Sequence, residues 1–281
     1  MTLRSDTAIG IFDSGVGGLS VLKHIHASLP QEKLIYFADS GYAPYGEKTE
    51  TAITERCLRI TDYLLEQHIK ALVVACNTAT AAAIKVLRQK FPALIIIGME
   101  PGLKPAVNVS RSRVVGVLAT QRTLASEKFR LLENQLSLAS GVQFVGQACT
   151  GLVNQIEQGE LRSAETMALL RRYLTPLLAA NADTIVLGCT HYPFVRPQIE
   201  EILSTLTQNQ QPLPIIDTGF AVAKHLQDRL IEDGLLSDTA TDAHQLQAYT
   251  TGSIDSLTFA FEHLLKMDIA NIKINLLKND H

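Results

Sequence analysis

The sequence predicts an α/β protein built of two similar parallel-sheet lobes, related by pseudo-two-fold symmetry, with the active site in the cleft between them. Two observations support this prediction. Short apolar runs end in clusters of glycine, serine, threonine or aspartate and lead into helical periodicity, which is typical of strand, loop and helix units in a parallel sheet. The same order of units then occurs a second time along the chain, as in an internal repeat.

The first lobe is expected to contain four of these units. Helices are predicted from Leu19 to Leu29 and from Glu50 to Ile69, because apolar residues recur there three and four positions apart, as in helices that face a core. The expected strands, each with the loop that follows it, are Ala8–Phe12 with DSGVGGLS, Leu34–Ala38 with DSGYAPYG, Ala71–Ala75 with CNTAT, and Leu94–Gly98 with MEPG.

The second lobe repeats this order. Its expected strands and loops are Arg113–Leu118 with ATQRT, Val142–Val145 with GQACTG, Asp183–Leu187 with GCTHYP, and Pro214–Ile216 with DTG. Equivalent positions are separated by slowly growing offsets, such as 106 residues from Gly10 to Gly116 and 113 residues from Cys76 to Cys189. A duplication with small insertions accounts for these offsets.

We therefore expect a first lobe over residues 1–101, a second lobe over residues 102–214, and a final segment, 215–281, that returns to complete the first lobe. Ligands of such folds bind outside the carboxyl ends of the strands, so the strand-end loops of both lobes would converge on one cleft. The alternative is a single doubly wound sheet in which the similarity between the halves is generic.

Composition narrows the class of protein further. The chain has 281 residues, of which 46% are hydrophobic and 19% are charged, so it can bury a core without staples and is not disordered. A net charge of -3 without a lysine and arginine cluster argues against a nucleic-acid partner. The sequence has no secretory n-region and no apolar run of about 18 residues, so we expect a cytoplasmic protein without a membrane partner.

The four cysteines divide into two pairs of different expected roles. They lie far apart without a CxxC pair, which argues against disulfides and zinc, and no histidine and carboxylate cluster suggests another metal. Cys57 falls on the core face of a predicted helix, and Cys149 is expected to pack in a loop or in the cleft wall. Cys76 and Cys189 are the candidates for chemistry.

Cys76 and Cys189 occupy equivalent strand ends in the two lobes. Cys76 precedes an alanine-rich helix start, where backbone N–H groups favour a thiolate. Cys189 precedes THYPF, in which Pro193 is expected early in a helix. A single cysteine usually packs in a core, but two at equivalent places suggest thiols that approach one ligand from opposite sides.

Polar residues beside these thiols are the next candidates. Asp13 and Ser14 end the first strand, where a carboxylate is suited to hold an ammonium group or to assist a thiol, although both residue types also form turns and caps. His191 lies two residues beyond Cys189 and titrates near neutral pH. Neutral donors suited either to carboxylate oxygens or to helix capping are Asn77, Thr78 and Thr190.

The glycine loop after the first strand has a weaker likeness to a dinucleotide fingerprint. Gly15, Gly17 and Gly18 are followed by Asp39, as a ribose-binding acid would follow a glycine-rich turn. However, Ser20 occupies the third glycine position and Asp13 would set a carboxylate beside the pyrophosphate. P-loop and GxSxG motifs are absent.

Several segments together resemble the glutamate racemase family. They are FDSGVGGLSV (12–21), the YG of PYG (45–46), ACNTAT (75–80), EPG (100–102) and GCTHYP (188–193), in order from about Ile9 to Gly219. The resemblance implies cofactor-independent interconversion of L- and D-glutamate by two cysteines, one on each face of the α-carbon. Cys76 would act on the D-enantiomer and Cys189 on the L-enantiomer.

The resemblance also implies roles for other residues. Asp13 and His191 match the auxiliary acid/base positions, and Glu157 matches the third. Where the family usually has Asp-Thr after the second strand, this chain has Asp39 and Ser40. The implied substrate contacts are Asp13, Ser14, Tyr45, Gly46, Asn77, Thr78, Thr190 and His191. For a bacterial source, the activity would supply D-glutamate for peptidoglycan.

Other functions remain open at this stage. They are a racemase of another acidic amino acid such as aspartate, a nicotinamide-dependent oxidoreductase that uses the glycine loop, a two-lobed protein that binds a small anion without turnover, and a hydrolase that uses Cys189 and His191. The expected partner is a small-molecule substrate, L- and D-glutamate. The sequence does not determine the oligomeric state, and the prediction allows a homodimer.

Overall fold

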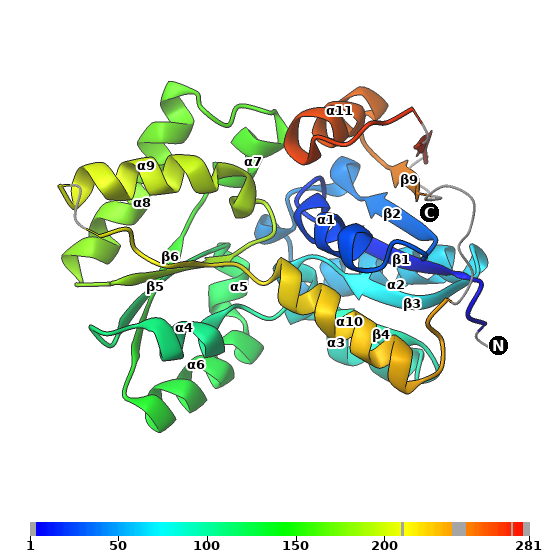
Figure 1. The fold of residues 1–281 in the computed structure, drawn as a ribbon, viewed down its shortest axis with the longest axis horizontal. Coiled ribbons are helices and arrows are strands. Elements are labelled where there is room, and N and C mark those ends of the chain that lie inside the picture. The colour runs from blue at the N-terminus through cyan, green and yellow to red at the C-terminus, as the bar shows by residue number, and fades with distance from the viewer. Residues whose placement is uncertain (1–3, 209–210, 238–245, 271, 278–281) are drawn as a thin grey trace. The chain divides into compact units, whose positions relative to one another are not determined.

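A computed structural model describes residues 4–208, 211–237, 246–270 and 272–277 (Figure 1). The chain divides into two compact units, which we call unit 1 (Met1–Met99 and Gly219–His281) and unit 2 (Glu100–Thr218). Each unit is built around its own parallel sheet.

Unit 1 contains a six-stranded sheet in which every neighbouring pair is parallel. Its central strands are buried along almost their whole length, which explains why they are apolar without alternation. The last two strands described extend the sheet beyond β2, so they belong to unit 1. In spatial order the strands are β10 (Lys273–Leu276), β9 (Leu246–Thr250), β2 (Leu34–Ala38), β1 (Ala8–Asp13), β3 (Ile69–Val74) and β4 (Ile95–Gly98).

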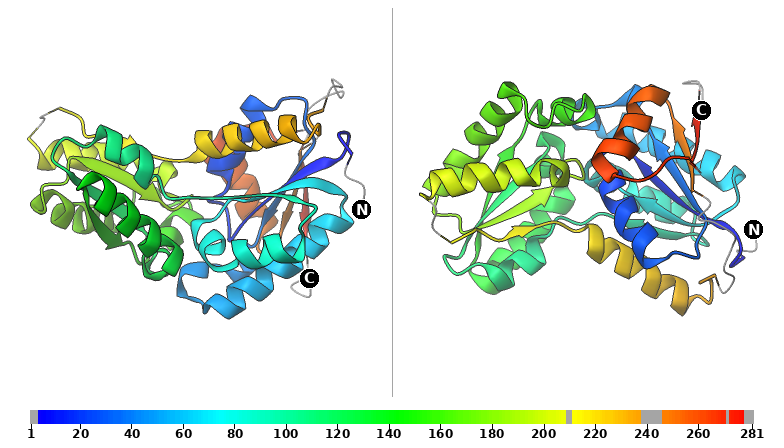
Figure 2. Two further views of the ribbon diagram at one scale, coloured as in Figure 1. Left: turned by 90° about the horizontal axis from the view of Figure 1, so that it is seen from below. Right: turned by 45° about the horizontal axis from the view of Figure 1, so that its top comes forward.

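Helices cover both faces of this sheet (Figure 2). On one face α1 (Leu19–Ser28) packs against α10 (Gly219–Glu232), and on the other α2 (Glu50–Glu66) packs against α3 (Asn77–Lys90). Cys57 on α2 is fully buried in the second of these layers, which confirms its predicted packing role. The shorter elements are η1 (Ser40–Tyr42), η2 (Tyr45–Glu47), α11 (Ile254–Phe259) and η4 (Ala260–Leu265).

Unit 2 contains a four-stranded parallel sheet with buried clusters on both sides. In spatial order its strands are β6 (Gln143–Ala148), β5 (Val114–Ala119), β7 (Thr184–Gly188) and β8 (Ile215–Ile216). Its helices are α4 (Leu103–Val109), α5 (Gln121–Ala125), α6 (Glu127–Ser140), α7 (Leu152–Glu157), α8 (Ala164–Ala179), η3 (Tyr192–Val195) and α9 (Arg196–Leu206).

The strand order of unit 2 repeats that of the first four strands of unit 1. The order β2-β1-β3-β4 in one sheet corresponds to β6-β5-β7-β8 in the other. Two separate sheets confirm the predicted α/β fold with two similar lobes, and the single doubly wound sheet is wrong. The second crossing between units lies at Thr218 and Gly219, four residues beyond the expected boundary, because β8 pairs with β7 and holds Ile215 and Ile216 in unit 2.

A buried carboxylate joins four segments of unit 1 at the carboxyl end of β2. Asp39 is fully buried, and its oxygens accept hydrogen bonds from Arg56 Nε (2.8 Å) and Arg56 Nη2 (2.7 Å) on α2. They also accept from the Tyr45 hydroxyl (2.7 Å) and from the Thr251 hydroxyl after β9 (2.8 Å). Because burial of a charge is costly unless it is paired and hydrogen-bonded, this set is stable only as a whole.

Replacing Asp39 should therefore destabilise the protein strongly. In Asp39→Asn the Arg56 guanidinium stays buried without its counter-charge, and we expect a loss of about 3–5 kcal/mol in the free energy of unfolding, measured by urea denaturation. Asp62→Asn is the matched control, because Asp62 forms a half-exposed pair with Lys90 that is worth about 1 kcal/mol or less. Equal losses in the two variants would contradict the prediction.

Candidate active site

Parallel strands bring the predicted site residues to one edge of each sheet. In unit 1 the carboxyl ends of β1, β2 and β3 lead to Asp13, Asp39 and Cys76. In unit 2 the carboxyl ends of β6 and β7 lead to Cys149 and Cys189. Each unit thus presents a cysteine directly after its third strand in chain order.

Cys76 is the N-cap residue of α3. Its Sγ accepts a hydrogen bond from the Ala79 backbone N–H at 3.5 Å, and its backbone is extended (φ -142°, ψ 121°), as in an N-cap. Backbone amides at a helix N-terminus favour negative charge on this sulfur. The thiol also lies 3.7 Å from Ser14 Oγ, to which it donates when protonated. Cys76 is nearly buried, with 5% of its surface exposed.

The glycine loop after β1 closes around Asp13. This carboxylate is fully buried, and its Oδ2 accepts hydrogen bonds from the Gly15 N–H (3.2 Å) and the Gly18 N–H (2.9 Å). Position 18 must be glycine because an added Cβ would lie 2.7 Å from Asp13 Cβ. Asp13 therefore forms the turn that holds Ser14 beside Cys76.

The nicotinamide alternative conflicts with these contacts. Asp39, the acid expected to bind a ribose, is fully buried and already accepts four hydrogen bonds from protein groups. The amides of Gly15 and Gly18, which would face a pyrophosphate, are turned to Asp13 instead. The glycine loop is therefore an internal turn, and this alternative is wrong.

Tyr45 is a buried residue of the loop after β2 and binds Asp39 through its hydroxyl. Its ring is 1% exposed and its hydroxyl donates to Asp39. Burial and the nearby Asp39 carboxylate raise the pKa of Tyr45 well above its ordinary value, so the phenol stays protonated. A substrate contact at Tyr45 would thus have to come from its backbone. Gly46 follows in the same short helix, η2.

In unit 2 a carboxylate, an imidazole and a thiol form a chain. Glu157, the last residue of α7, lies 2.5 Å from His191 Nε2 through its Oε1, and His191 Nδ1 lies 3.7 Å from Cys189 Sγ. Burial alone would lower the pKa of His191, but the contacts with Cys189 and Glu157 outweigh it and raise the pKa well above its ordinary value. The geometry permits proton exchange between His191 and Cys189.

The surroundings of the two thiols differ. Cys189 is followed by a short 3₁₀ helix, η3, in which Pro193 lies in the first turn as expected, rather than by a long α-helix. Cys189 therefore has an imidazole neighbour where Cys76 has a helix N-terminus and a hydroxyl. The two units therefore have the same topology but surround their cysteine thiols with different polar groups.

Cys149 has no place in this chain of groups. It is 3% exposed, packs in the core of unit 2, and donates to the Gln147 carbonyl at 3.5 Å. Burial raises the pKa of its thiol, which keeps it protonated and unreactive. Cys149 thus packs in the core of unit 2, where loop or cleft-wall packing was expected.

Neutral donors lie next to both cysteines. Asn77 and Thr78 occupy the first turn of α3, Thr190 follows Cys189, and all three are at most 5% exposed. The Asn77 Nδ2 group is buried and has no hydrogen-bond partner among the described residues. A buried amide without a partner is costly, so Asn77 Nδ2 is a candidate donor to a ligand oxygen.

Thr120 is a candidate that the sequence reasoning missed. It follows β5 as Ser14 follows β1, and it caps α5 through a hydrogen bond to its Oγ1 from the Thr123 N–H. The offset of 106 that relates Gly10 to Gly116 also relates Ser14 to Thr120. Applying the repeat to every loop residue, and not only to the cysteines, would have found it.

Comparison with known proteins identifies the family. Residues 9–226 match the sequence model of the Asp/Glu/Hydantoin racemases. The glutamate racemase of Pseudomonas syringae pv. tomato is 53% identical over 232 residues, which cover 83% of this chain and 82% of that protein. The chain belongs to the glutamate racemase family.

Solved structures of glutamate racemases have the same fold. Isoform RacE1 from Bacillus anthracis aligns with a TM-score of 0.84 at 29% identity and covers 98% of this chain and 99% of its own. The Francisella tularensis enzyme, solved with D-glutamate, aligns with a TM-score of 0.81 at 28% identity and covers 96% and 97%. Membership makes this racemase an isomerase that acts on amino acids.

The described part of the chain lacks two features. Within it, no group of three or more histidine, cysteine, aspartate or glutamate side chains is arranged to hold a metal ion. None of its helices combines the length and apolar character needed to cross a membrane.

The raised pKa of His191 predicts a pH-dependent stability. Protonated His191 stabilises the fold fully below its ordinary pKa of about 6.5, and this contribution is lost as the pH rises through the raised value. His191→Gln should therefore lose about 1.5–3 kcal/mol near pH 6 and less at alkaline pH, as measured by urea denaturation across this range. His225→Gln, at an exposed histidine of α10, is the control. A loss for His191→Gln that does not change with pH would refute the assignment.

Proposed function

We propose that the chain interconverts L- and D-glutamate without a cofactor, by proton transfer between the substrate and two cysteines. Cys76 and Cys189 act on opposite faces of the α-carbon. The observation that carries the proposal is the repeat itself, because each unit places one cysteine after its third strand with its own polar partners. A single base would give no reason for the second site.

The chemistry balances as two coupled proton transfers. The thiolate of Cys76 removes the α-proton of D-glutamate, and the thiol of Cys189 donates a proton to the other face, which gives L-glutamate. The reverse reaction begins with Cys189 as the thiolate. Because an α-proton is a very weak acid, the base must be well positioned and the developing charge must be stabilised.

Each cysteine has groups suited to its two protonation states. The Ala79 N–H and the N-terminus of α3 stabilise the thiolate of Cys76, and Ser14 accepts the S–H bond once the proton has arrived. His191 exchanges a proton with Cys189, and Glu157 holds the imidazole in place from the other side.

The neutral donors suit a substrate with two carboxylates. The side chains near the thiols donate hydrogen bonds to a carboxylate without adding a cation that would neutralise the thiolates; these residues are Asn77, Thr78 and Thr190. The buried Asn77 amide has no acceptor among the described residues. Asp13, which precedes Ser14, adds a buried carboxylate that favours the substrate ammonium group. Backbone groups of Tyr45 and Gly46 complete the set of proposed contacts.

The proposal extends to the setting of the reaction. The substrate is the small molecule glutamate, with no nucleic-acid or membrane partner, and D-glutamate is supplied for peptidoglycan synthesis. Reduced thiols persist in the cytoplasm, which is the compartment that a two-thiol mechanism needs. Assembly as a homodimer is compatible with the mechanism, since each chain carries both cysteines.

Deuterium incorporation tests the two-base mechanism. In heavy water, each glutamate enantiomer should give product that carries deuterium at the α-carbon from the first turnover, because the proton removed and the proton added reside on different thiols. Loss of the α-proton is followed by NMR and inversion by circular dichroism. Cys76→Ala and Cys189→Ala should each lower the racemisation rate by about 10²–10⁴-fold.

Cys149→Ala is the matched control for these variants, because it removes a buried strand-end thiol without touching the proposed chemistry. Racemisation at the wild-type rate by either active-site variant would overturn the mechanism. Aspartate is tested in parallel, since equal turnover of aspartate would favour the alternative of a broader acidic amino-acid racemase. Tight binding of glutamate without turnover would favour the binding-protein alternative, and activity that survives loss of Cys76 would favour the hydrolase.

The unpartnered amide of Asn77 gives a second test. If its Nδ2 donates to a substrate carboxylate, Asn77→Ala should raise the KM for glutamate roughly 10- to 100-fold, as expected for loss of a hydrogen bond to a charged group. Steady-state kinetics with each enantiomer measure this change. Asn134→Ala, at an exposed asparagine of α6, is the control and should leave the KM unchanged. An unaltered KM in Asn77→Ala would remove this residue from the site.

A further inference from the structure

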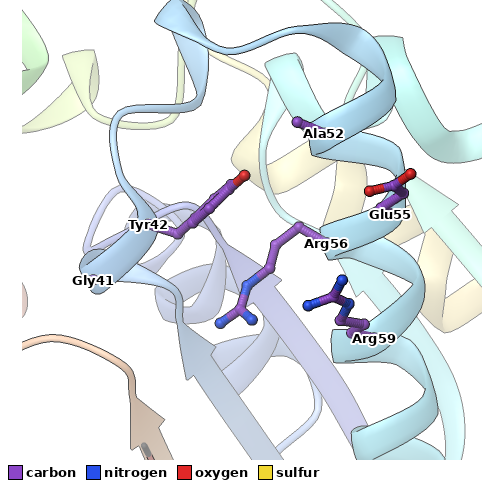
Figure 3. A pocket seen from close by; sticks show the side chains of 6 residues that line it. All are labelled: Gly41, Tyr42, Ala52, Glu55, Arg56 and Arg59. Atoms are coloured by element: carbon purple, nitrogen blue, oxygen red, sulfur yellow. The ribbon is translucent and has the colours of Figure 1, made fainter. Parts of the chain in front are cut away.

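Unit 1 contains a pocket that has no part in the proposed reaction. It has a volume of about 230 Å³ and lies between η1 and the first half of α2 (Figure 3). None of its lining residues is a proposed catalytic or substrate-binding residue. The lining residues are Gly41, Tyr42, Ala52, Glu55, Arg56 and Arg59.

Two guanidinium groups face this pocket from the same helix. Arg56 and Arg59 are three residues apart on α2 and therefore share a face. Arg56 is 5% exposed and is held by Asp39. Arg59 is exposed, forms no ion pair with any residue that the structure describes, and turns its guanidinium toward that of Arg56 (Figure 3). The buried Asp39 carboxylate therefore pairs with Arg56, and the charge of Arg59 is left without a carboxylate partner among the described residues.

A further positive charge, on Lys48, lies against the ring of Tyr42, which is one of the lining residues. The Lys48 ammonium lies 4.2 Å from the centroid of the Tyr42 ring, and the Arg56 guanidinium lies 5.6 Å from the same centroid. Glu55 is the only acidic residue in the lining. Positive charge is therefore in excess around a space that is open to a small ligand.

We propose that this pocket is a binding site for a phosphoryl group, either free phosphate or the phosphate of a small metabolite. A guanidinium fork matches the oxygens of phosphate and forms short charge-assisted hydrogen bonds with them. A dianion is favoured over a monoanion because it relieves the repulsion between Arg56 and Arg59 and still leaves Lys48 with a partner. The volume admits the anion together with part of its hydration shell.

The contacts of Arg56 connect this site to the loop after β2. Arg56 holds Asp39, and Asp39 holds Tyr45 and Thr251. An anion that shares Arg56 therefore acts on the same network that positions Tyr45, which gives phosphate a route to alter the KM for glutamate. That consequence rests on the proposed function, whereas phosphate binding itself does not.

Calorimetric and ³¹P NMR titration of the whole protein with inorganic phosphate at low ionic strength tests the site. We expect saturable binding that Arg59→Gln weakens about tenfold and that Glu55→Gln strengthens, because the latter removes the opposing carboxylate. Arg172→Gln, at an exposed arginine on α8 of unit 2, is the matched control and should leave the affinity unchanged. Glycerol 3-phosphate in a parallel titration distinguishes the two sources, since tighter binding of the ester points to a metabolite.

Absence of saturable phosphate binding would overturn the proposal. So would an affinity that Arg59→Gln and Arg172→Gln lower equally, because phosphate would then be attracted only by net charge. Neither result affects the racemase proposal, because every variant leaves Cys76, Cys189 and their partners in place. Retained racemisation in Arg59→Gln and Glu55→Gln also shows that the variants are folded.

Discussion

The carboxylate of Asp39 accepts hydrogen bonds from three side chains that belong to different segments of the chain. Arg56 comes from α2, Tyr45 from the loop after β2, and Thr251 from the turn after β9. Removal of one partner from a buried charge is strongly destabilising, so these segments depend on one another for their positions. The loop that carries Tyr45 and Gly46 is held through this contact, and the turn after β9 gains a side-chain bond in addition to the backbone pairing of β9 with β2.

The two halves of the repeat show that a shared topology does not dictate shared chemistry. Both place a thiol where the third strand ends, because parallel strands collect their carboxyl ends at one edge. Cys76 lies at the N-terminus of a fourteen-residue helix. Cys189 lies beside His191, whose other ring nitrogen contacts the Glu157 carboxylate. The two units differ in these loops, whereas the strands that support them have the same order. The two cysteines thus have the same place in the topology but different polar neighbours.

Periodicity and repetition were sufficient to predict the α/β fold with two parallel sheets. They failed where a side chain meets a partner distant in the sequence. Asp39 resembled a ribose-binding acid because its spacing from the glycine loop was suitable, yet one of its partners, Thr251, lies 212 residues away. The buried state of Tyr45 depends on the same contact. The boundary near Thr218 was missed because a two-residue strand has too short a pattern to be assigned to a sheet from sequence.

The discontinuity of unit 1 bears on how the protein is made. Residues of unit 2 are contiguous, so a ribosome emits that unit whole while β9 and β10 are still to be translated. Until those strands arrive, β2 is an open edge and the Asp39 carboxylate lacks Thr251. An unpaired, apolar parallel edge is prone to pair with other chains. Nascent chains are thus most vulnerable to aggregation late in translation, and a premature stop near the end yields a product that contains Cys76 and Cys189 but leaves the edge of β2 unpaired.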